Sequence, residues 1–301
     1  MKLGVTSLDI DGVFSGGGLK GFAMIGALQV LEARGFRFVR VAGTSAGSII
    51  AAFIAAGYRS DEMYQMLEET DMLNFLDERK TLIPSSVGKW LLLYWRLGLY
   101  KGDSLEKWLY KKLEARGVRT FGDLPHQKLR VITSDVTSGR LVILPDDLPK
   151  YNIDPRTFPV AKALRMSCSI PYFFEPVKIK NKGVPFLFVD GGVLSNFPLW
   201  LFDKDNVQKV RPALGIRLSS NLESVPVKSI NNAITMFGAL FETMKDAHDA
   251  RYISRRHEKN IIFIPTQHVM TTEFEMTEER KKSLVELGRI RTEMFLRKWC
   301  Y

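Results

Sequence analysis

Hydrophobic positions along the chain follow two spacings in turn, and this predicts strands that alternate with helices. Apolar residues at successive or alternate positions indicate short strands, whereas apolar residues three and four apart indicate helices. The first four elements are expected at 7–14 (strand), 19–34 (helix), 36–42 (strand) and 46–56 (helix). Gly35 and Gly57 follow the two helices, where glycine commonly ends a helix. This β-α-β-α start predicts a parallel sheet in an α/β domain.

The same alternation continues to the end of the chain. Further strands are predicted at 128–134, 140–144, 186–189, 213–218 and 261–264. Further helices are predicted at 60–72, 103–116, 158–168, 230–257 and 277–299. Asp103 and Glu106 match the D-x-x-E pattern of a capping box at the start of one of them. No repeat, low-complexity tract or linker divides the 301 residues, so one domain over 1–301 is expected.

Composition narrows the partners and the compartment. The chain has 43 Lys and Arg against 33 Asp and Glu, a net charge of +10, which favours an anionic partner. No zinc-finger spacing, RNP-like motif or long basic block is present, so nucleic acid is not expected and a membrane or acidic lipid is. The two cysteines, Cys168 and Cys300, indicate a reducing compartment and no metal site.

The sequence predicts neither a secretory signal peptide nor a membrane-spanning helix. The first residues show no signal peptide, and the longest low-charge run, 41–57, is shorter than the roughly 20 apolar residues of a membrane-spanning helix. We therefore expect a cytoplasmic protein that contacts membranes only peripherally.

Two glycine-rich motifs lie between a predicted strand and a predicted helix. Gly16, Gly18 and Gly21 match the G-x-G-x-x-G pattern of a dinucleotide fold, but the second strand ends without the acidic residue that such a fold needs. The second motif, 43–47, reads Gly-Thr-Ser-Ala-Gly. A serine in G-x-S-x-G at a sharp strand-to-helix turn is typical of a nucleophile, because glycines two residues away leave room for the turn. Ser45 is therefore the candidate nucleophile.

A nucleophilic serine changes the interpretation of the first glycines. Acyl transfer passes through a tetrahedral oxyanion, which backbone N–H groups can stabilise. Gly16, Gly17 and Gly18 are candidate donors, and Ala46, the residue after the nucleophile, is another.

The serine also needs a base. Asp190 ends a predicted buried strand and is followed by two glycines, which makes it the leading candidate, although an Asp-Gly pair alone is more often a turn. Asp135 ends another strand and is the weaker candidate, best explained as a turn residue.

Taken together, these motifs resemble those of the patatin-like phospholipases. The run 16–21 resembles the oxyanion loop of that family, 43–47 its nucleophile elbow and 190–192 its catalytic aspartate motif, in the same order. The runs 120–124, 165–171 and 196–198 also resemble family sequence, so the likeness extends over about 7–296. One departure is Lys20, where the family usually has arginine, and which is a candidate contact for the substrate headgroup.

The resemblance implies a fold, a reaction and a site. It implies a three-layer α/β/α fold with a mostly parallel central sheet, in a single acyl hydrolase domain. It implies phospholipase A-type cleavage of acyl esters by a Ser45–Asp190 dyad through an acyl-enzyme, with no metal or cofactor. The substrate would be a phospholipid or another acyl-ester lipid.

Three alternatives remain open. His248, His257 and His268 follow Asp190 in the order of a Ser-Asp-His triad, but too few strands precede Ser45 for the conventional α/β-hydrolase fold. An acyltransferase would use the same acyl-enzyme. A non-catalytic lipid-binding scaffold is the third alternative, and the presence of both Ser45 and Asp190 argues against it.

Two segments are candidates for membrane contact. The segment 80–102 contains Trp90 and Trp95 beside cationic residues, which suits either a cap that docks on lipid or a helix packed on the core. As part of a cap that admits the acyl chain, Trp90 and Trp95 are also candidate substrate contacts. The helix at 277–299 is basic and amphipathic, but it also carries glutamates, so either an anionic bilayer or solvent can face its charged side.

Overall fold

The computed structural model describes residues 8–77, 93–202, 211–219, 230–231, 233–252, 258–266 and 276–299. Within them, an eight-stranded sheet has the order β10-β9-β1-β2-β4-β8-β7, with β5 paired to β4. The parallel strands are β1 (Leu8–Phe14), β2 (Phe36–Thr44), β4 (Leu129–Asp135), β9 (Ala213–Ser219) and β10 (Ile261–Pro265). The antiparallel strands are β5 (Arg140–Leu144), β7 (Val177–Asn181) and β8 (Val184–Asp190).

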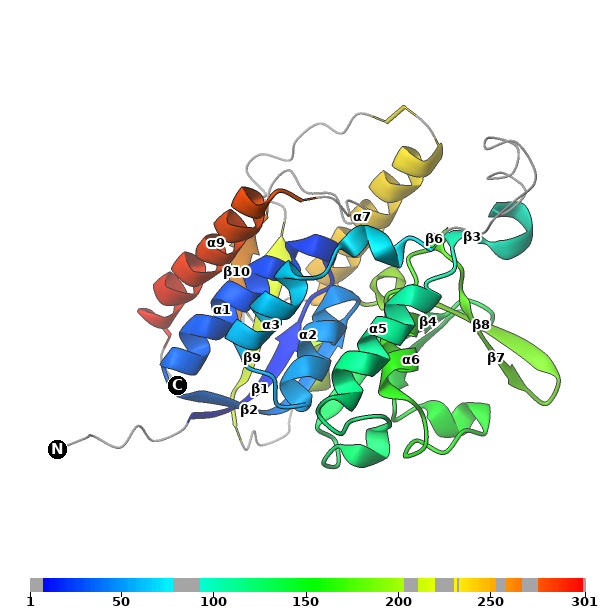
Figure 1. Ribbon diagram of the computed structural model, residues 1–301, viewed down its shortest axis with the longest axis horizontal. Helices are drawn as coiled ribbons and strands as arrows, with labels where there is room; N and C mark the ends of the chain where they lie inside the picture. The colour runs from blue at the N-terminus through cyan, green and yellow to red at the C-terminus, as the bar shows by residue number, and fades with distance from the viewer. Residues whose placement is uncertain are drawn as a thin grey trace.

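Side chains alternate between the two faces of this sheet. Ile10 and Phe14 of β1 belong to the main core, whereas Val13 lies in a smaller cluster on the other face. Helices on the main face are α1 (Phe22–Ala33), α2 (Ala46–Ala55), α3 (Ser60–Glu68), α5 (Asp103–Glu114), α6 (Val160–Ser167) and α9 (Glu278–Leu296) (Figure 1). The opposite face packs on the short helix η6 (Leu199–Leu201). The predicted three-layer fold with a mostly parallel sheet is confirmed.

The C-terminal helix α9 packs on α1 at unusually short range. A methyl group on Gly26 of α1 would lie 1.9 Å from the Val285 carbonyl oxygen, and one on Gly288 of α9 would lie 1.9 Å from the Ala23 carbonyl oxygen. The two helix backbones therefore touch, as only glycine permits. The glutamates of α9 were the reason to consider that solvent, and not an anionic bilayer, faces its charged side. Arg289 on that side forms an ion pair with a neighbouring glutamate, which supports this alternative.

Two helix ends differ from the prediction. The predicted helix at 60–72 ends at Glu68, and a short helix η2 (Met72–Phe75) follows, capped by the Asp71 side chain, which accepts the Leu73 N–H at 3.0 Å. The Asp103–Glu106 capping box is wrong. Gly102 is the N-cap of α5, with φ +75°, and the Asp77 carboxylate accepts the N–H groups of Gly102 (2.6 Å) and Ser104 (2.9 Å).

Sequence reasoning missed a two-stranded parallel sheet beside the main one. It joins β3 (Gly98–Tyr100) to β6 (Tyr172–Phe174). Among the described residues, no helix combines the length and apolar character needed to cross a membrane.

Candidate active site

Ser45 occupies a strained turn between β2 and α2. Its backbone has φ +52° and ψ −129°, a conformation that non-glycine residues rarely adopt. The turn needs both flanking glycines, because a methyl group on Gly43 would lie 2.3 Å from the Gly47 carbonyl oxygen, and one on Gly47 would lie 2.3 Å from the Phe14 carbonyl oxygen. The hydroxyl therefore stands at the N-terminus of α2, where the helix dipole favours negative charge.

Ser167 holds the backbone of this turn, a role that sequence reasoning did not assign. Its hydroxyl oxygen accepts the Ser45 N–H at 2.8 Å and donates to the Ile132 carbonyl oxygen of β4 at 2.5 Å. The run 165–171 had suggested that this segment matters, but a contact between residues 122 positions apart has no local signal in sequence.

Asp190 lies beside Ser45 because of strand register. Thr44 pairs with Ile132, and Thr133 pairs with Asp190, so the end of β8 lies next to the end of β2 across β4. Gly191 permits this approach, since a methyl group there would lie 2.4 Å from the Ile132 carbonyl oxygen. The Asp190 N–H donates to the Ser169 carbonyl oxygen at 2.8 Å, which fixes the backbone.

The Asp190 carboxylate is buried and only half satisfied. The side chain is 1% exposed, its Oδ1 accepts the Gly192 N–H at 2.7 Å, and its Oδ2 has no hydrogen-bond partner among the described residues. Burial raises the pKa of Asp190 to about 6, against the lowering effects of the Gly192 N–H, the Ser45 side chain and the Lys245 charge. The free Oδ2 is thus an acceptor available to a proton from Ser45.

The glycine loop places several amide groups near the serine. The Gly16 N–H is already engaged, because it donates to the Asn196 carbonyl oxygen at 3.2 Å. Within the described part of the chain, the N–H groups of Gly17, Gly18 and Ala46 have no protein acceptor. A methyl group on Gly16 would lie 2.5 Å from Asn196 Oδ1 and 3.2 Å from Ser45 Cβ, so this glycine provides space beside the nucleophile.

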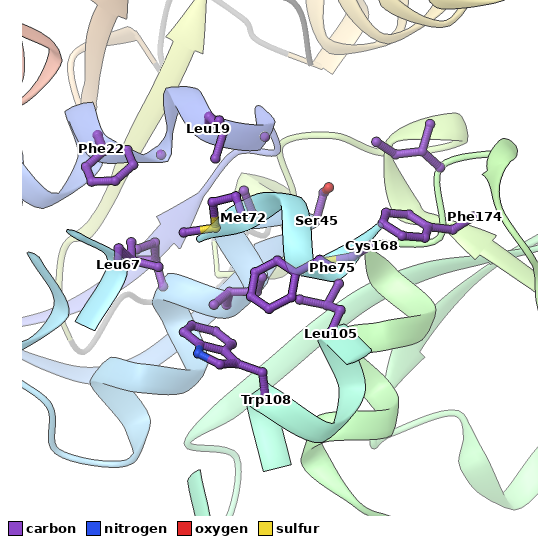
Figure 2. Close-up of a pocket in the computed structure, with 16 residues that line it drawn as sticks. Leu19, Phe22, Ser45, Leu67, Met72, Phe75, Leu105, Trp108, Cys168 and Phe174 are labelled. Carbon is purple, nitrogen blue, oxygen red and sulfur yellow. The ribbon is translucent and has the colours of Figure 1, made fainter. Parts of the chain in front are cut away.

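An apolar pocket of about 810 Å³, including its open part, begins at Ser45. Its walls come from the start of α1, from α2, α3, η2 and α5, and from the segment after α6 (Figure 2). Ser45 is the one labelled residue in Figure 2 whose side chain carries an oxygen. The labelled side chains are Leu19, Phe22, Ser45, Leu67, Met72, Phe75, Leu105, Trp108, Cys168 and Phe174. Such a pocket suits a long apolar group whose reacting end lies at the serine.

Residues 12–203, more than half of the chain, match the family model described as patatin-like phospholipase. The chain belongs to the patatin-like phospholipase family. The Bacillus subtilis protein YqhO, described as uncharacterized, is 56% identical over 292 residues, which cover 97% of this chain and 99% of YqhO. An intracellular phospholipase A2 of Caenorhabditis elegans is 28% identical over 65% of this chain and 16% of its own.

Solved structures give the same fold. VipD from Legionella pneumophila superposes with a TM-score of 0.58 at 18% identity, over 96% of this chain and 67% of VipD. At that identity the likeness concerns the fold alone. Family membership, together with relatives such as a probable lipid hydrolase of invertebrate iridescent virus 6, supports a lipid hydrolase as the class of enzyme.

Two of the residues expected to contact substrate, Lys20 and Trp95, are absent from the walls of this pocket. Lys20, at the position where the family usually has arginine, lies 4.0 Å from Glu242 of α7 (Ala233–Tyr252) and does not line the pocket. Trp95 is 71% exposed, which also rules out its packing on the core. Trp90 lies outside the described residues. An indole does line the pocket, but it is that of Trp108.

Cys168 lies between Ser167, which binds the Ser45 backbone, and Ser169, which binds the Asp190 backbone, and it lines the pocket. Burial raises the pKa of its thiol, and the nearby Asp190 charge raises it further. A neutral thiol is a poor nucleophile, so Cys168 is best explained as a packing residue, as the sequence indicated.

Of the four histidines, His126 is the one whose side chain the structure describes. His126 is exposed in the turn before β4, at the opposite edge of the sheet. The backbone of His248 belongs to α7, whereas His257 and His268 lie outside the described residues. In the part of the chain that the structure describes, no group of three His, Cys, Asp or Glu residues could hold a metal ion.

Asp135 is engaged in its own turn. Its carboxylate accepts the Thr137 N–H at 2.9 Å, the Tyr151 hydroxyl at 2.9 Å and the Ser138 hydroxyl. These bonds leave it in the role of a turn residue.

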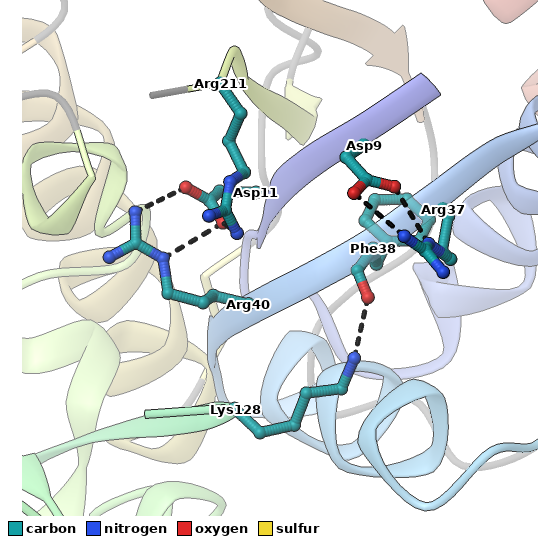
Figure 3. A network of polar contacts seen from close by, with 7 residues as sticks. All are labelled: Asp9, Asp11, Arg37, Phe38, Arg40, Lys128 and Arg211. Carbon is teal, nitrogen blue, oxygen red and sulfur yellow. Dashed lines mark hydrogen bonds and ion pairs between the residues drawn. The ribbon is translucent and has the colours of Figure 1, made fainter. Parts of the chain in front are cut away.

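Charged side chains gather at the other edge of the sheet, where β1 and β2 begin (Figure 3). Asp9 and Asp11 lie opposite Arg37 and Arg40 in the register of the two strands, and each arginine binds its aspartate with two nitrogens. Arg211 lies 3.7 Å from Asp11, which is 1% exposed. This network fixes the register of the two strands that end at the glycine loop and at Ser45.

Proposed function

We propose that this chain is a lipid acyl hydrolase that cleaves fatty acyl esters of phospholipids through a Ser45–Asp190 dyad. The observation that carries the proposal is a strained serine at the end of an apolar pocket, beside a buried carboxylate with one free oxygen. Each of the three features has a use in ester hydrolysis. The pocket accepts the acyl chain, the strained turn exposes the hydroxyl, and the carboxylate accepts its proton.

In the first half of the reaction, Asp190 Oδ2 takes the proton as Ser45 Oγ attacks the ester carbonyl carbon. The negative charge then develops on the carbonyl oxygen, for which the free N–H groups of Gly17, Gly18 and Ala46 are the donors we assign. Gly16 supplies space rather than a donor, since its N–H is engaged by Asn196. The C–O bond breaks, the leaving alcohol takes the proton from Asp190, and the acyl group stays on Ser45.

In the second half, Asp190 takes a proton from water, and the hydroxide attacks the acyl-enzyme. Collapse releases the fatty acid and returns the proton to Ser45. A carboxyl with a pKa of about 6 is a stronger base than an ordinary aspartate and is still mostly ionised at neutral pH, so it can both accept and return a proton.

The test is incubation with vesicles of mixed phospholipids, followed by mass spectrometry of the released fatty acids and lysolipids. Wild type should release both, whereas Ser45→Ala and Asp190→Asn should each lose most of the activity, and the double variant should lose little more. Asp135→Asn is the matched control, because it makes the same change at a neighbouring strand end and should stay active per folded molecule.

Three outcomes would contradict the proposal. Product release by folded Ser45→Ala would remove the nucleophile from the mechanism. A histidine variant as inactive as Asp190→Asn, and still folded, would restore a triad. Transfer of the acyl group to added lysolipid or glycerol in preference to water would identify an acyltransferase.

A further inference from the structure

Helix α7 has one face on the candidate active site and another in solvent. Its buried face carries Phe241, 5% exposed, against the turn after Asp190: a methyl group on Gly192 would lie 3.3 Å from the Phe241 ring. Lys245, one turn later, is 7% exposed and opposes the rise in the pKa of Asp190. The helix therefore packs directly on the part of the molecule that carries the base.

Among the described side chains of α7, which end at Lys245, three large apolar ones are exposed to solvent. Met236, Leu240 and Met244 follow one another at intervals of four residues, so they lie along one side of α7. They are 49%, 53% and 52% exposed. Helices that only cover a core usually show polar residues on that side.

A second group of exposed apolar side chains adjoins α7 through the small sheet. Tyr94 and Trp95 are 74% and 71% exposed, stack edge to face at 5.1 Å, and lie just before β3. β3 pairs with β6 at Tyr172, whose ring packs on Phe237 of α7 at 4.9 Å. Tyr172 is itself 52% exposed. In Figure 1, β3 and β6 likewise lie next to α7.

These residues form one surface, which we call the apolar rim. It consists of Tyr94, Trp95, Leu97, Tyr172, Met236, Leu240 and Met244. The rim and the pocket share strand β6, because Phe174 lines the pocket and Tyr172 lies in the rim. A contiguous apolar surface of this kind usually marks an interaction site.

We propose that the apolar rim docks on the surface of a lipid bilayer and so brings the pocket to its substrate. The proposal rests on the proposed function, since a phospholipid must leave a bilayer to reach Ser45. A rim of Tyr and Trp beside Met and Leu matches the side chains that settle at a membrane interface. The net charge of +10 adds attraction to anionic lipids. A second copy of the chain is the competing occupant.

The experiment compares two sets of substitutions. Met236→Gln, Leu240→Gln and Met244→Gln are combined on α7, where glutamine keeps helix propensity. Ile290→Gln and Met294→Gln are combined on α9 as the matched control, since these side chains are also four residues apart and are 48% and 51% exposed. Binding is measured by flotation with vesicles of phosphatidylcholine and phosphatidylglycerol, and folding by circular dichroism.

The α7 variant should bind vesicles about tenfold or more weakly, while the α9 variant should stay within about twofold of wild type. Hydrolysis of vesicle phospholipid should fall with binding, and hydrolysis of a soluble short-chain ester should fall much less. Unchanged vesicle binding by the α7 variant would overturn the proposal, as would equal losses on both substrates. A wild-type dimer that the α7 substitutions convert to monomer, with vesicle binding intact, would assign the rim to a second copy instead.

Binding and catalysis are separated by Ser45→Ala. This variant should bind vesicles as wild type does, because Ser45 lies in the pocket and not in the rim. If wild type hydrolyses no ester at all, the proposed function fails, whereas the flotation result still decides whether the rim binds lipid.

Discussion

Replacing Asp190 by asparagine should inactivate the protein and, at alkaline pH, make it more stable. The folded structure raises the pKa of Asp190 from 3.8 to about 6, chiefly by burial. The folded state therefore holds an ionised carboxylate in a place that favours the neutral form. At about 1.4 kcal/mol per pKa unit, the shift of about 2 units costs the folded state about 3 kcal/mol at pH 8. Asparagine cannot ionise and escapes this cost.

The sign of the pH dependence follows from proton binding. Between pH 3.8 and about 6, the folded state binds more protons at Asp190 than the unfolded state does, so this site lowers the free energy of unfolding as pH rises. The full cost is present above pH 6, and only about 1 kcal/mol of it at pH 4.5. We expect the free energy of unfolding of Asp190→Asn to exceed that of wild type by about 1–3 kcal/mol at pH 8. The gain can be smaller than the full cost because burial also removes the amide group from water. The advantage of Asp190→Asn should shrink by about 2 kcal/mol at pH 4.5.

The assay is urea unfolding at the two pH values, followed by circular dichroism. Asp135→Asn is the control with the opposite sign, because its carboxylate accepts bonds from Thr137, Ser138 and Tyr151 that an amide cannot all replace. That control should lose about 1–3 kcal/mol. An Asp190→Asn protein that is less stable than wild type at pH 8, or whose advantage is equal at both pH values, would refute the reasoning.

Three further predictions concern single substitutions. Gly47→Ala should lower the free energy of unfolding by about 1–3 kcal/mol or more and remove most activity, because its methyl group would lie 2.3 Å from a backbone oxygen. Gly238→Ala is the control: a methyl group there has nothing within 4 Å, so the free energy of unfolding should rise by up to about 1 kcal/mol. Equal urea midpoints for the two variants would contradict this prediction. Lys245→Gln should raise the pKa of Asp190, so the acid limb of the pH profile of kcat/KM should move to higher pH. An acid limb at the wild-type pH would show that the Lys245 charge does not affect the pKa of Asp190. Leu105→Trp should narrow the pocket and shift the preference to shorter acyl chains, measured as kcat/KM ratios across an ester series; an unchanged ratio would remove Leu105 from the acyl-binding wall.

The parts of the site that sequence could predict are those set by local spacing. A serine between glycines at a strand-to-helix turn, and an aspartate before two glycines at a strand end, each carry their geometry within five residues. The structure gives Ser45 the expected strained backbone and brings Asp190 beside it. The oxyanion role expected of the Gly16 N–H could not be judged from local spacing, because this N–H donates to the carbonyl oxygen of Asn196, a residue 180 positions later.

Features that depend on distant partners were not visible. Ser167 anchors Ser45 across 122 positions, and Asp77 caps α5 from 25 residues away, in place of the local capping box. The hairpin of β7 and β8 had a local signal that was overlooked, since 181–183 reads Asn-Lys-Gly with positive φ at the last two residues. Trp95 precedes β3, whose partner strand β6 lies about 70 residues later, so its exposed position could not be predicted from its neighbours in sequence.

The most direct test of the central claim is covalent labelling of the nucleophile. A fluorophosphonate reacts with a serine that is activated by a base and an oxyanion hole, and mass spectrometry of the digested protein identifies the residue modified. We predict one phosphonyl group on the peptide that contains Ser45, much slower labelling in Asp190→Asn, and none in Ser45→Ala. Labelling at another serine, or a rate that Asp190→Asn leaves unchanged, would contradict the dyad.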